Sequence, residues 1–346
     1  MAETKTPESR AQSRVKYYRR YRGYDYSRGV ALFVTIVTEP RRSLFGRVVD
    51  AKIELNEFGL DVIDAIEAIP RFNQEIVLHG HVLMGDHLHM NLYLKPGLSN
   101  PLQTLGAAIR RFKTWTTTLA RKRMGLASIW QQGYHDRICV SRRFIEATER
   151  YIAYNPLKFE LMHNRPEFLR IREPLDSPRL SDEGYWKGIG NVALLSPDQK
   201  IVSLRISRKV KDLAPVVARM ESAVRQGYAI LSGFISPGEI AVRDRLLGNK
   251  DARLIHILPS CLANGHRPDS RYLPLLQEGR FLEIGEGNDE TDFGRSACLA
   301  LNDEIAAIAR AGEGLALYWR AEGPAVLRGA EPAIQDLRGA EPAIQD

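Results

Sequence analysis

The pattern of hydrophobic and polar positions changes near the middle of the chain. In the first half, short apolar runs predict strands over 31–39, 75–84, 87–94 and 137–140, and a β-hairpin over 46–56. Apolar residues at helical spacing predict helices over 57–69, 101–125 and 141–155. Strands joined by hairpins and interleaved with helices indicate an α+β domain with an antiparallel sheet.

In the second half, strands and helices alternate regularly. Apolar runs predict strands over 201–207, 228–235, 253–259 and 280–285, and amphipathic patterns predict helices over 214–227, 236–248 and 295–311. This alternation is typical of a parallel, Rossmann-like α/β sheet.

These patterns predict two domains with further segments around them. The expected order is a disordered N-terminus over 1–12, an α+β domain over 13–173, a linker rich in Pro, Asp and Ser over 174–199, a Rossmann-like domain over 200–320 and a disordered tail over 321–346. The tail contains LRGAEPAIQD twice, and two short copies are too few to form a solenoid.

Composition narrows the class of protein. The chain has 346 residues, 44% of them hydrophobic and 26% charged, which excludes a fibrous or wholly disordered protein. Its three cysteines form no CxxC pair, so we expect neither a disulfide scaffold nor a cysteine zinc site, and a reducing cytoplasm is the expected location. No apolar run is long enough for a membrane span, and we expect no secretory signal.

The positive charge lies in the first half. Residues 1–173 contain 28 Lys and Arg against 18 Asp and Glu, a net charge of +10, whereas residues 174–346 contain 21 against 24, a net charge of −3; together these give the +7 of the whole chain. A basic half suggests a polyanionic partner, and a solvated basic surface is the alternative.

Two histidines suggest a metal site. His87 and His89 are two residues apart on a predicted strand, so both imidazoles face the same side of the sheet. Such a pair can chelate one divalent cation with a polar third ligand, although isolated HxH motifs are more often structural or surface histidines.

A tyrosine and an asparagine follow on the predicted helix over 141–155. Tyr151 and Asn155 are four residues apart and would share one helix face. A tyrosine hydroxyl beside a metal-bound phosphate can serve as a covalent nucleophile. The alternative is that Tyr151 is a core aromatic residue of an amphipathic helix, and Tyr154 ranks second as nucleophile.

These elements resemble a known family. HLH, then WQQGYHDRI over 130–138 and RYIAYNPLK over 150–158, together with YRGYDYSRG near the start, are similar to the REP-associated tyrosine transposases, which are single-tyrosine HUH transposases of the TnpA type. The resemblance implies an HUH nuclease domain with a ferredoxin- or RRM-like antiparallel sheet. It implies His87 and His89 as ligands of Mg²⁺ or Mn²⁺, Asn155 as a further ligand and Tyr151 as the nucleophile.

The activity implied by this resemblance is cleavage and rejoining of single-stranded DNA at hairpin-forming repeats through a 5′-phosphotyrosine. A domesticated protein that binds DNA hairpins without cleaving them is the alternative, and a homodimer is compatible with the family. The protein would then be cytoplasmic and associated with the nucleoid. His135 and Asp136, close to the motif, are candidate second-shell groups.

Two basic segments are candidate DNA-binding surfaces. Over 14–28, basic residues are interleaved with tyrosines, whose rings can stack on unpaired bases. Over 97–143, basic residues lie on or beside one long predicted helix and would contact backbone phosphates. The candidate residues are Arg14, Lys16, Tyr17, Tyr18, Arg19, Arg20, Arg22, Arg110, Arg111, Lys113, Arg121, Lys122 and Arg123.

The second domain resembles the Rossmann-like modules of the SLOG and DNA-processing-protein-A type over about 200–310. A DNA or nucleotide contact near 232–239, at a predicted helix start, is one hypothesis for this domain. A nucleotide-sensing protein that acts through this domain, and a purely structural or partner-binding module, are the alternatives.

Overall fold

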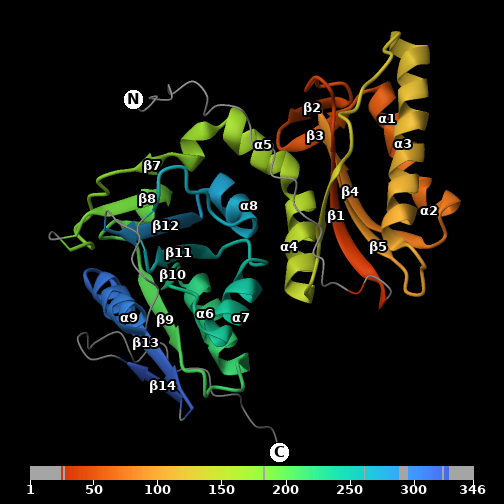
Figure 1. Ribbon diagram of the computed structural model, residues 1–346. Helices are drawn as coiled ribbons and strands as arrows, with labels where there is room; N and C mark the ends of the chain where they lie inside the picture. Colours follow the sequence, from red (N-terminus) through yellow and green to blue (C-terminus); the bar gives the residue numbers. More distant parts are fainter. Residues whose placement is uncertain are drawn as a thin grey trace, which may run out of the picture. The chain divides into compact units, whose positions relative to one another are not determined.

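The computed structural model describes residues 25, 28–181, 184–260, 262–287, 295–321 and 323–326 (Figure 1). The chain divides into two compact units, one comprising Met1–Arg47 with Ile53–Ala153 and the other Val48–Lys52 with Tyr154–Asp346. The candidate DNA-binding residues Arg14, Lys16, Tyr17, Tyr18, Arg19, Arg20 and Arg22 lie outside the described residues, as do both copies of the repeated sequence.

The first unit is built on a four-stranded sheet in the order β4-β5-β1-β6, in which every neighbouring pair is antiparallel. The strands are β1 (Val30–Val37), β4 (Ile76–Leu83), β5 (His87–Leu94) and β6 (His135–Ile138). The helices are α1 (Glu57–Glu67), α2 (Ile69–Phe72), α3 (Pro101–Met124) and α4 (Arg142–Ala153).

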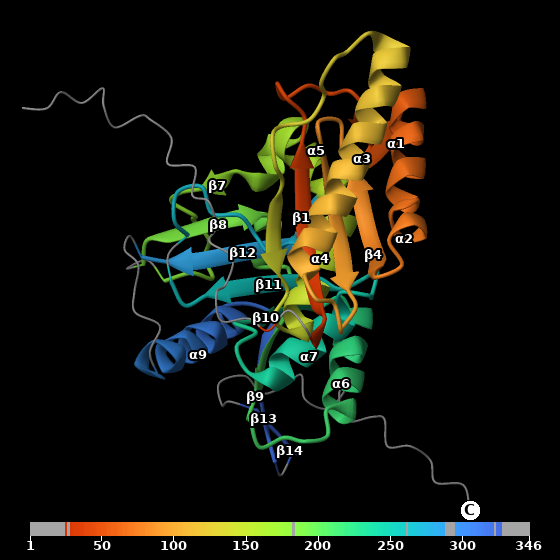
Figure 2. The same cartoon turned by 45° about the vertical axis from the view of Figure 1, so that its right-hand side comes forward.

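Alternation along the strands gives this sheet one face that packs against α1 and α3. Leu32, Val34, Leu88 and Met90 are buried with residues of these two helices in one hydrophobic core. The two helices lie side by side (Figures 1 and 2). The strand residues that alternate with these core residues, including the histidines of β5, therefore point to the opposite face of the sheet. On that face α4 contacts β4 and β5.

The predicted hairpin over 46–56 is present as β2 (Gly46–Val49) and β3 (Lys52–Leu55). Its two turn residues, Asp50 and Ala51, have φ values of 48° and 60°. Two positive φ values are the backbone geometry that a two-residue hairpin turn requires.

The second unit contains an eight-stranded sheet in the order β14-β13-β9-β10-β11-β12-β8-β7. Its five central strands are parallel, and β14, β8 and β7 pair antiparallel at the edges. The strands are β7 (Ile171–Arg172), β8 (Trp186–Gly190), β9 (Ile201–Ile206), β10 (Ala229–Ser232), β11 (Arg253–Leu258), β12 (Phe281–Glu286), β13 (Gly314–Arg320) and β14 (Gly323–Val326).

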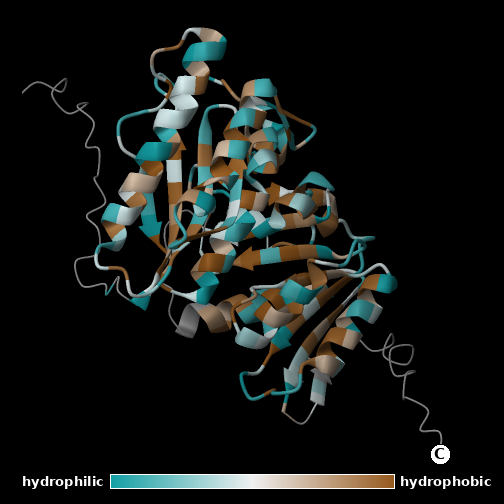
Figure 3. Ribbon diagram, turned by 90° about the vertical axis from the view of Figure 1, so that its right-hand side faces the viewer, coloured by the Kyte–Doolittle hydropathy of each residue, from teal (hydrophilic) through white to brown (hydrophobic). Residues whose placement is uncertain are grey.

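Helices cover both faces of this sheet. Residues of α6 (Ala214–Arg225), α7 (Pro237–Leu246) and α8 (Leu273–Gln277) are buried with one face, and residues of α9 (Arg295–Arg310) with the other. The parallel strands are apolar along most of their length, as expected for strands buried on both sides (Figure 3). Three short 3₁₀ helices, η3 (Pro166–Leu169), η4 (Val192–Leu195) and η5 (Ser270–Tyr272), and α5 (Asn155–His163) belong to the same unit.

The expected linker over 174–199 is wrong in part, because it contains β8 and η4. Trp186 and Ile189 of β8 are buried, and the strand pairs with β12. The sequence WKGIG is short and has two glycines, so it lacks the apolar run that identifies a strand. The tail expected from 321 also begins too early, since β14 pairs with β13 over Gly323–Val326.

The predicted helix over 141–155 is two helices. Ser141 caps α4 by accepting a hydrogen bond from the Phe144 amide at 3.2 Å. The helix ends at Ala153, however, and Asn155 begins α5, with Pro156 in its first turn. Proline lacks an N–H and is tolerated in the first turn, so here it opens a helix and does not end one.

Candidate active site

The candidate site lies on the face of the first unit's sheet that α4 covers. His87 and His89 of β5 point to this face, as their spacing predicts, and their ring centroids are 4.8 Å apart. His89 is 6% exposed. In the register of the sheet, His89 lies directly opposite Thr35 of β1, and His87 lies opposite Val37.

Each imidazole is oriented by a hydrogen bond through Nδ1. His89 Nδ1 is 2.8 Å from the Thr35 hydroxyl, and His87 Nδ1 is 2.5 Å from an oxygen of Asp86, whose other oxygen is 3.2 Å from the Arg41 guanidinium. A metal-binding histidine commonly engages one ring nitrogen in this way and binds the ion through the other. Nε2 is therefore the coordinating nitrogen that this arrangement favours in both rings.

The turn before β5 fixes where the first histidine lies. The backbone carbonyl of Gly85 accepts hydrogen bonds from the amides of Leu44 and Phe45, and the carbonyl of Asp86 accepts one from Thr38. A Cβ at Gly85 would lie 2.8 Å from the carbonyl oxygen of Gly46. Glycine is therefore required at this position by the close approach of another segment.

Tyr151 of α4 packs against His89. Its ring centroid is 5.2 Å from that of His89 in an edge-on arrangement, and 5.7 Å from that of Phe33, which itself stacks on His89 at 5.0 Å. Thr148 and Ile152 are the buried residues of α4, and Tyr151 follows Thr148 by three positions, so these two lie on neighbouring positions of the helix surface. The structure therefore brings together the two histidines and the tyrosine that the sequence singles out.

Asn155 and Tyr154 belong to the second unit. The shared helix face predicted for Tyr151 and Asn155 is wrong, because the two residues lie on different helices. Asn155 is buried, and Tyr154 packs against the hydrophobic core of the second unit. The geometry of the candidate site therefore rests on His87, His89 and Tyr151.

The nitrogen and oxygen donors at this site are few for a divalent cation. Among the described residues, no group of three or more His, Cys, Asp or Glu side chains could hold a metal ion. Two imidazoles oriented through Nδ1 fit Mg²⁺ or Mn²⁺ only if amide, water or phosphate oxygens complete the coordination.

His135 and Asp136, the two further candidate residues near the motif, lie on opposite faces of β6. His135 is opposite Thr35 in the register, and so lies in one row with Thr35 and His89. Asp136 is opposite Val34, whose side chain is buried in the core on the other face. Alternation thus directs His135 towards the candidate site and Asp136 away from it.

The second HxH pair, His79 and His81 on β4, does not form a chelating pair. A β-bulge between Leu78 and Gly80 shifts the register, so that His81 lies opposite Met90 on the core face. Burial lowers the pKa of His81, against a smaller opposing effect of Glu67. His79 lies on the other face, with its ring 6.2 Å from that of Tyr93.

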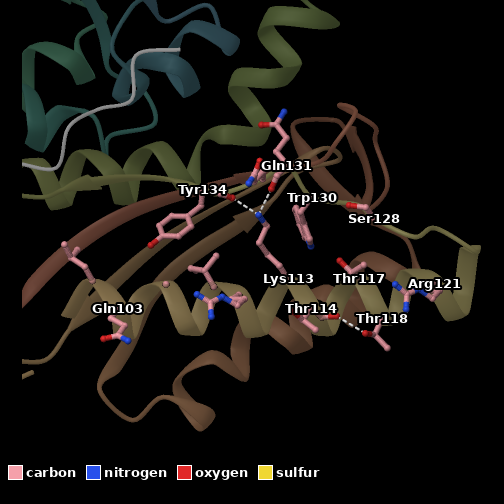
Figure 4. A pocket seen from close by; sticks show the side chains of 16 residues that line it. Gln103, Lys113, Thr114, Thr117, Thr118, Arg121, Ser128, Trp130, Gln131 and Tyr134 are labelled. Atoms are coloured by element: carbon pink, nitrogen blue, oxygen red, sulfur yellow. Dashed lines mark hydrogen bonds between the residues drawn. The ribbon is translucent and has the colours of Figure 1, made fainter. Parts of the chain in front are cut away.

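The basic helix α3 presents part of its charge to a groove with a volume of about 750 Å³ (Figure 4). Arg110, Lys113 and Arg121 line this groove, together with Thr114 and Thr117 of the same helix. Lys113 donates hydrogen bonds to the carbonyls of Gln131 and Gly133 at 2.5 and 2.6 Å, and burial lowers its pKa. Arg110 and Arg121 are therefore the better candidates for phosphate contact.

The other basic residues of α3 lie elsewhere. The Arg111 guanidinium lies 4.2 Å from the ring centroid of Phe72. Arg123 forms ion pairs with Glu57 and Asp61 of α1. Lys122 is exposed and does not line the groove. The six basic residues predicted as one DNA-binding surface therefore divide between the groove and other surroundings.

At the start of α7 in the second unit, Glu239 occupies the predicted phosphate site. Its carboxylate accepts hydrogen bonds from the backbone amides of Ile206, Ile235 and Ser236, and Ser236 caps the helix in return. The amides of Ile235, Ser236 and Glu239 around the helix start are thus engaged by the side chains of Glu239 and Ser236. The hypothesis of a phosphate contact near 232–239 therefore has no support from this geometry.

The second unit also contains a cluster of His256, His266 and Glu283. The sequence does not predict this cluster, because no local motif joins the three residues. The two oxygens of Glu283 lie 2.8 Å from His256 Nδ1 and 2.7 Å from His266 Nε2. Burial acts to raise the pKa of Glu283, but the hydrogen bonds and charges of the two histidines outweigh it and lower the pKa.

Comparisons with known proteins give partial similarities. No family model matches the chain. An uncharacterised protein of Haemophilus influenzae is 28% identical over 158 residues, which cover 41% of this chain and 88% of that protein. A solved REP-associated tyrosine transposase bound to a REP hairpin is 23% identical, with a TM-score of 0.32, and covers 41% of this chain and 72% of that one.

DNA processing protein A from Helicobacter pylori, solved in a study of its single-stranded DNA binding mode, is 14% identical, with a TM-score of 0.34; the match covers 44% of this chain and 71% of that one. At these values, the similarities do not assign a function to this chain. In the part of the chain that the structure describes, no helix is both long and apolar enough to cross a membrane.

Proposed function

We propose that the first unit cleaves and rejoins single-stranded DNA, with Tyr151 as the nucleophile and the His87–His89 pair as ligands of a divalent cation. The observation that carries this proposal is the convergence of the Tyr151, His89 and His87 rings at centroid distances of 5.2 and 4.8 Å. The residues arrive from a strand and a helix that are far apart in sequence. Two oriented imidazoles beside a phenol suit metal-assisted nucleophilic catalysis.

In this proposal, the Tyr151 hydroxyl loses its proton and attacks the phosphorus of a phosphodiester. The bond to the 3′-oxygen breaks, and the products are a 5′-phosphotyrosine and a free 3′-hydroxyl. Attack by a 3′-hydroxyl on the phosphotyrosine reverses the step and rejoins a strand without ATP. A bound Mg²⁺ or Mn²⁺ would polarise the phosphoryl oxygen.

The other residues of the site position these groups. Thr35 and Asp86 hold the two imidazoles through their Nδ1 atoms, and Phe33 packs against both His89 and Tyr151. Asn155 is proposed as a further ligand because of the family resemblance. Arg110 and Arg121 in the groove beside α3 would contact backbone phosphates of a hairpin or single strand. The second unit, with its parallel central sheet, is proposed to be a Rossmann-like module.

The test is formation of a covalent adduct. Wild-type protein is incubated with Mn²⁺ and a labelled single-stranded hairpin oligonucleotide from the DNA flanking the gene, and analysed under denaturing conditions. We expect an adduct that EDTA abolishes, that Tyr151→Phe loses and that Tyr154→Phe, the matched control, retains. An adduct that forms equally with Tyr151→Phe would refute the assignment. DNA binding without any adduct would favour the non-catalytic binding protein.

A further inference from the structure

An arginine of the first unit's sheet lies on the same face as the candidate site. Arg137 of β6 is the only lysine or arginine in the four described strands of this sheet. In the register, Arg137 lies directly opposite Phe33 of β1, whose ring contacts those of His89 and Tyr151. Paired residues of neighbouring strands share a face, so Arg137 projects from the same side of the sheet as these two groups.

The contacts of Arg137 place its charge beside α4. The central carbon of its guanidinium is 5.9 Å from the ring centroid of Phe144. Phe144 precedes Tyr151 by about two helical turns, so the two side chains lie on one flank of α4. Burial raises the pKa of the Cys139 thiol, which is 4.0 Å from the Thr148 hydroxyl of α4, and the charge of Arg137 is among the smaller effects that oppose this shift.

DNA can approach this arginine from solvent. Arg137 is exposed, and β6 is a strand at the edge of the sheet. Side chains on an α-helix lean towards its N-terminus, which for Tyr151 is the direction of Phe144. A phosphodiester held at the Tyr151 phenol would therefore lie on the flank of α4 beside which the guanidinium lies.

The proposed reaction needs positive charge at this phosphate. A phosphodiester carries one negative charge, and an attacking phenolate brings a second. The imidazoles of His87 and His89 are neutral when they bind a cation through Nε2, so they add no charge of their own. Arg41 is engaged by Asp86, the residue that orients His87. A guanidinium presents paired N–H donors that match two oxygens of one phosphate.

We propose that Arg137 binds the non-bridging oxygens of the phosphodiester that Tyr151 attacks. Its guanidinium holds the phosphate in place and stabilises the negative charge on these oxygens while the bond to Tyr151 forms and the bond to the 3′-oxygen breaks. Arg137 stays protonated and neither takes nor gives a proton. The inference rests on the proposed function, and it adds to the histidines and the tyrosine a further catalytic residue.

The test compares two substrates in single-turnover reactions with Mn²⁺. The bond that wild type cleaves is mapped on the hairpin oligonucleotide, and a second oligonucleotide is made with a methylphosphonate at that bond, where an uncharged methyl group replaces one non-bridging oxygen. With the ordinary phosphodiester at saturating concentration, Arg137→Gln should form the adduct about 100-fold more slowly than wild type. Arg137→Lys should recover part of this loss, because it keeps the charge without the paired donors. Arg47→Gln, the matched control, removes an exposed arginine paired with Glu54 and should react at the wild-type rate.

With the methylphosphonate, wild type and Arg137→Gln should react at similar rates, because the charge that Arg137 contacts is absent. An equal loss on both substrates would show that Arg137 acts on folding or on general DNA binding, and would overturn the inference. A wild-type rate for Arg137→Gln on the phosphodiester would overturn it as well. Failure of the proposed function is distinct, since wild type would then form no adduct, whereas failure of this inference leaves an adduct that depends on Tyr151.

Discussion

The two units use the same polar residues in opposite ways. In the second unit, both oxygens of Glu283 are bonded to histidines, and the carboxylate of Glu239 binds three backbone amides. In the first unit, His87 and His89 are oriented through Nδ1 next to a tyrosine, and the amide of Asn91 has no partner among the described residues. The difference teaches that histidines and acids in the second unit stabilise the fold, whereas those in the first unit are arranged for a ligand.

The largest expected effect is a loss of stability when the buried glutamate of the second unit is replaced. Glu283→Gln should lower the free energy of unfolding by about 3 kcal/mol, because it replaces a buried carboxylate held by His256 and His266. Chemical denaturation measures this loss. The adduct assay at a temperature where the variant is folded should be unchanged. A variant as stable as wild type would show that the cluster is not structural.

Removal of a group that orients a histidine in the first unit should lower activity and leave stability nearly unchanged. Thr35→Val keeps the side-chain shape but removes the hydroxyl that is 2.8 Å from His89 Nδ1. We expect the rate of adduct formation to fall by about 10- to 100-fold, with metal binding weakened similarly. The Tm should change little. An unchanged rate would show that Thr35 does not orient the imidazole for catalysis.

The sequence pattern predicts that both histidines lie on one face of the sheet, and it predicts the break between the strands over 75–84 and 87–94. It also predicts the helices α1 and α3, because alternation and helical spacing determine these features. The approach of Tyr151 to His89 was implied only by the family resemblance, because no local pattern specifies a contact between distant elements. The break between Ala153 and Asn155 was missed because Pro156 can either end one helix or open the next. The bulge at His79 and the strand β8 depend on pairing partners that the sequence alone does not identify.

A smaller effect concerns the groove beside α3. Replacing both Arg110 and Arg121 by Gln should weaken binding of single-stranded DNA and reduce the slope of log K against log salt by about 1.4, since each phosphate contact contributes about 0.7. Arg123→Gln is the matched control, because Arg123 is paired with Glu57 and Asp61. Equal slopes for the double variant and wild type would remove the groove from the DNA interface.

The smallest expected effect is the dependence of stability on pH. The pKa of Glu283 in the folded protein lies below its ordinary value of 4.5. The stabilisation by Glu283 is therefore fully present above about pH 4.5 and is lost as the pH falls through the folded pKa. The difference in Tm between wild type and Glu283→Gln should narrow as the pH falls below 4.5. A difference that does not narrow would contradict the depressed pKa.

The central claim is that the phenol of Tyr151 forms the bond to DNA. After reaction with Mn²⁺ and a hairpin oligonucleotide, nuclease and trypsin digestion leaves a nucleotide on the peptide from Tyr151 to Lys158, which contains both Tyr151 and Tyr154. Fragmentation in the mass spectrometer should place the added phosphate on Tyr151. A phosphate on Tyr154, or its absence from this peptide in a protein that cleaves DNA, would contradict the proposed mechanism.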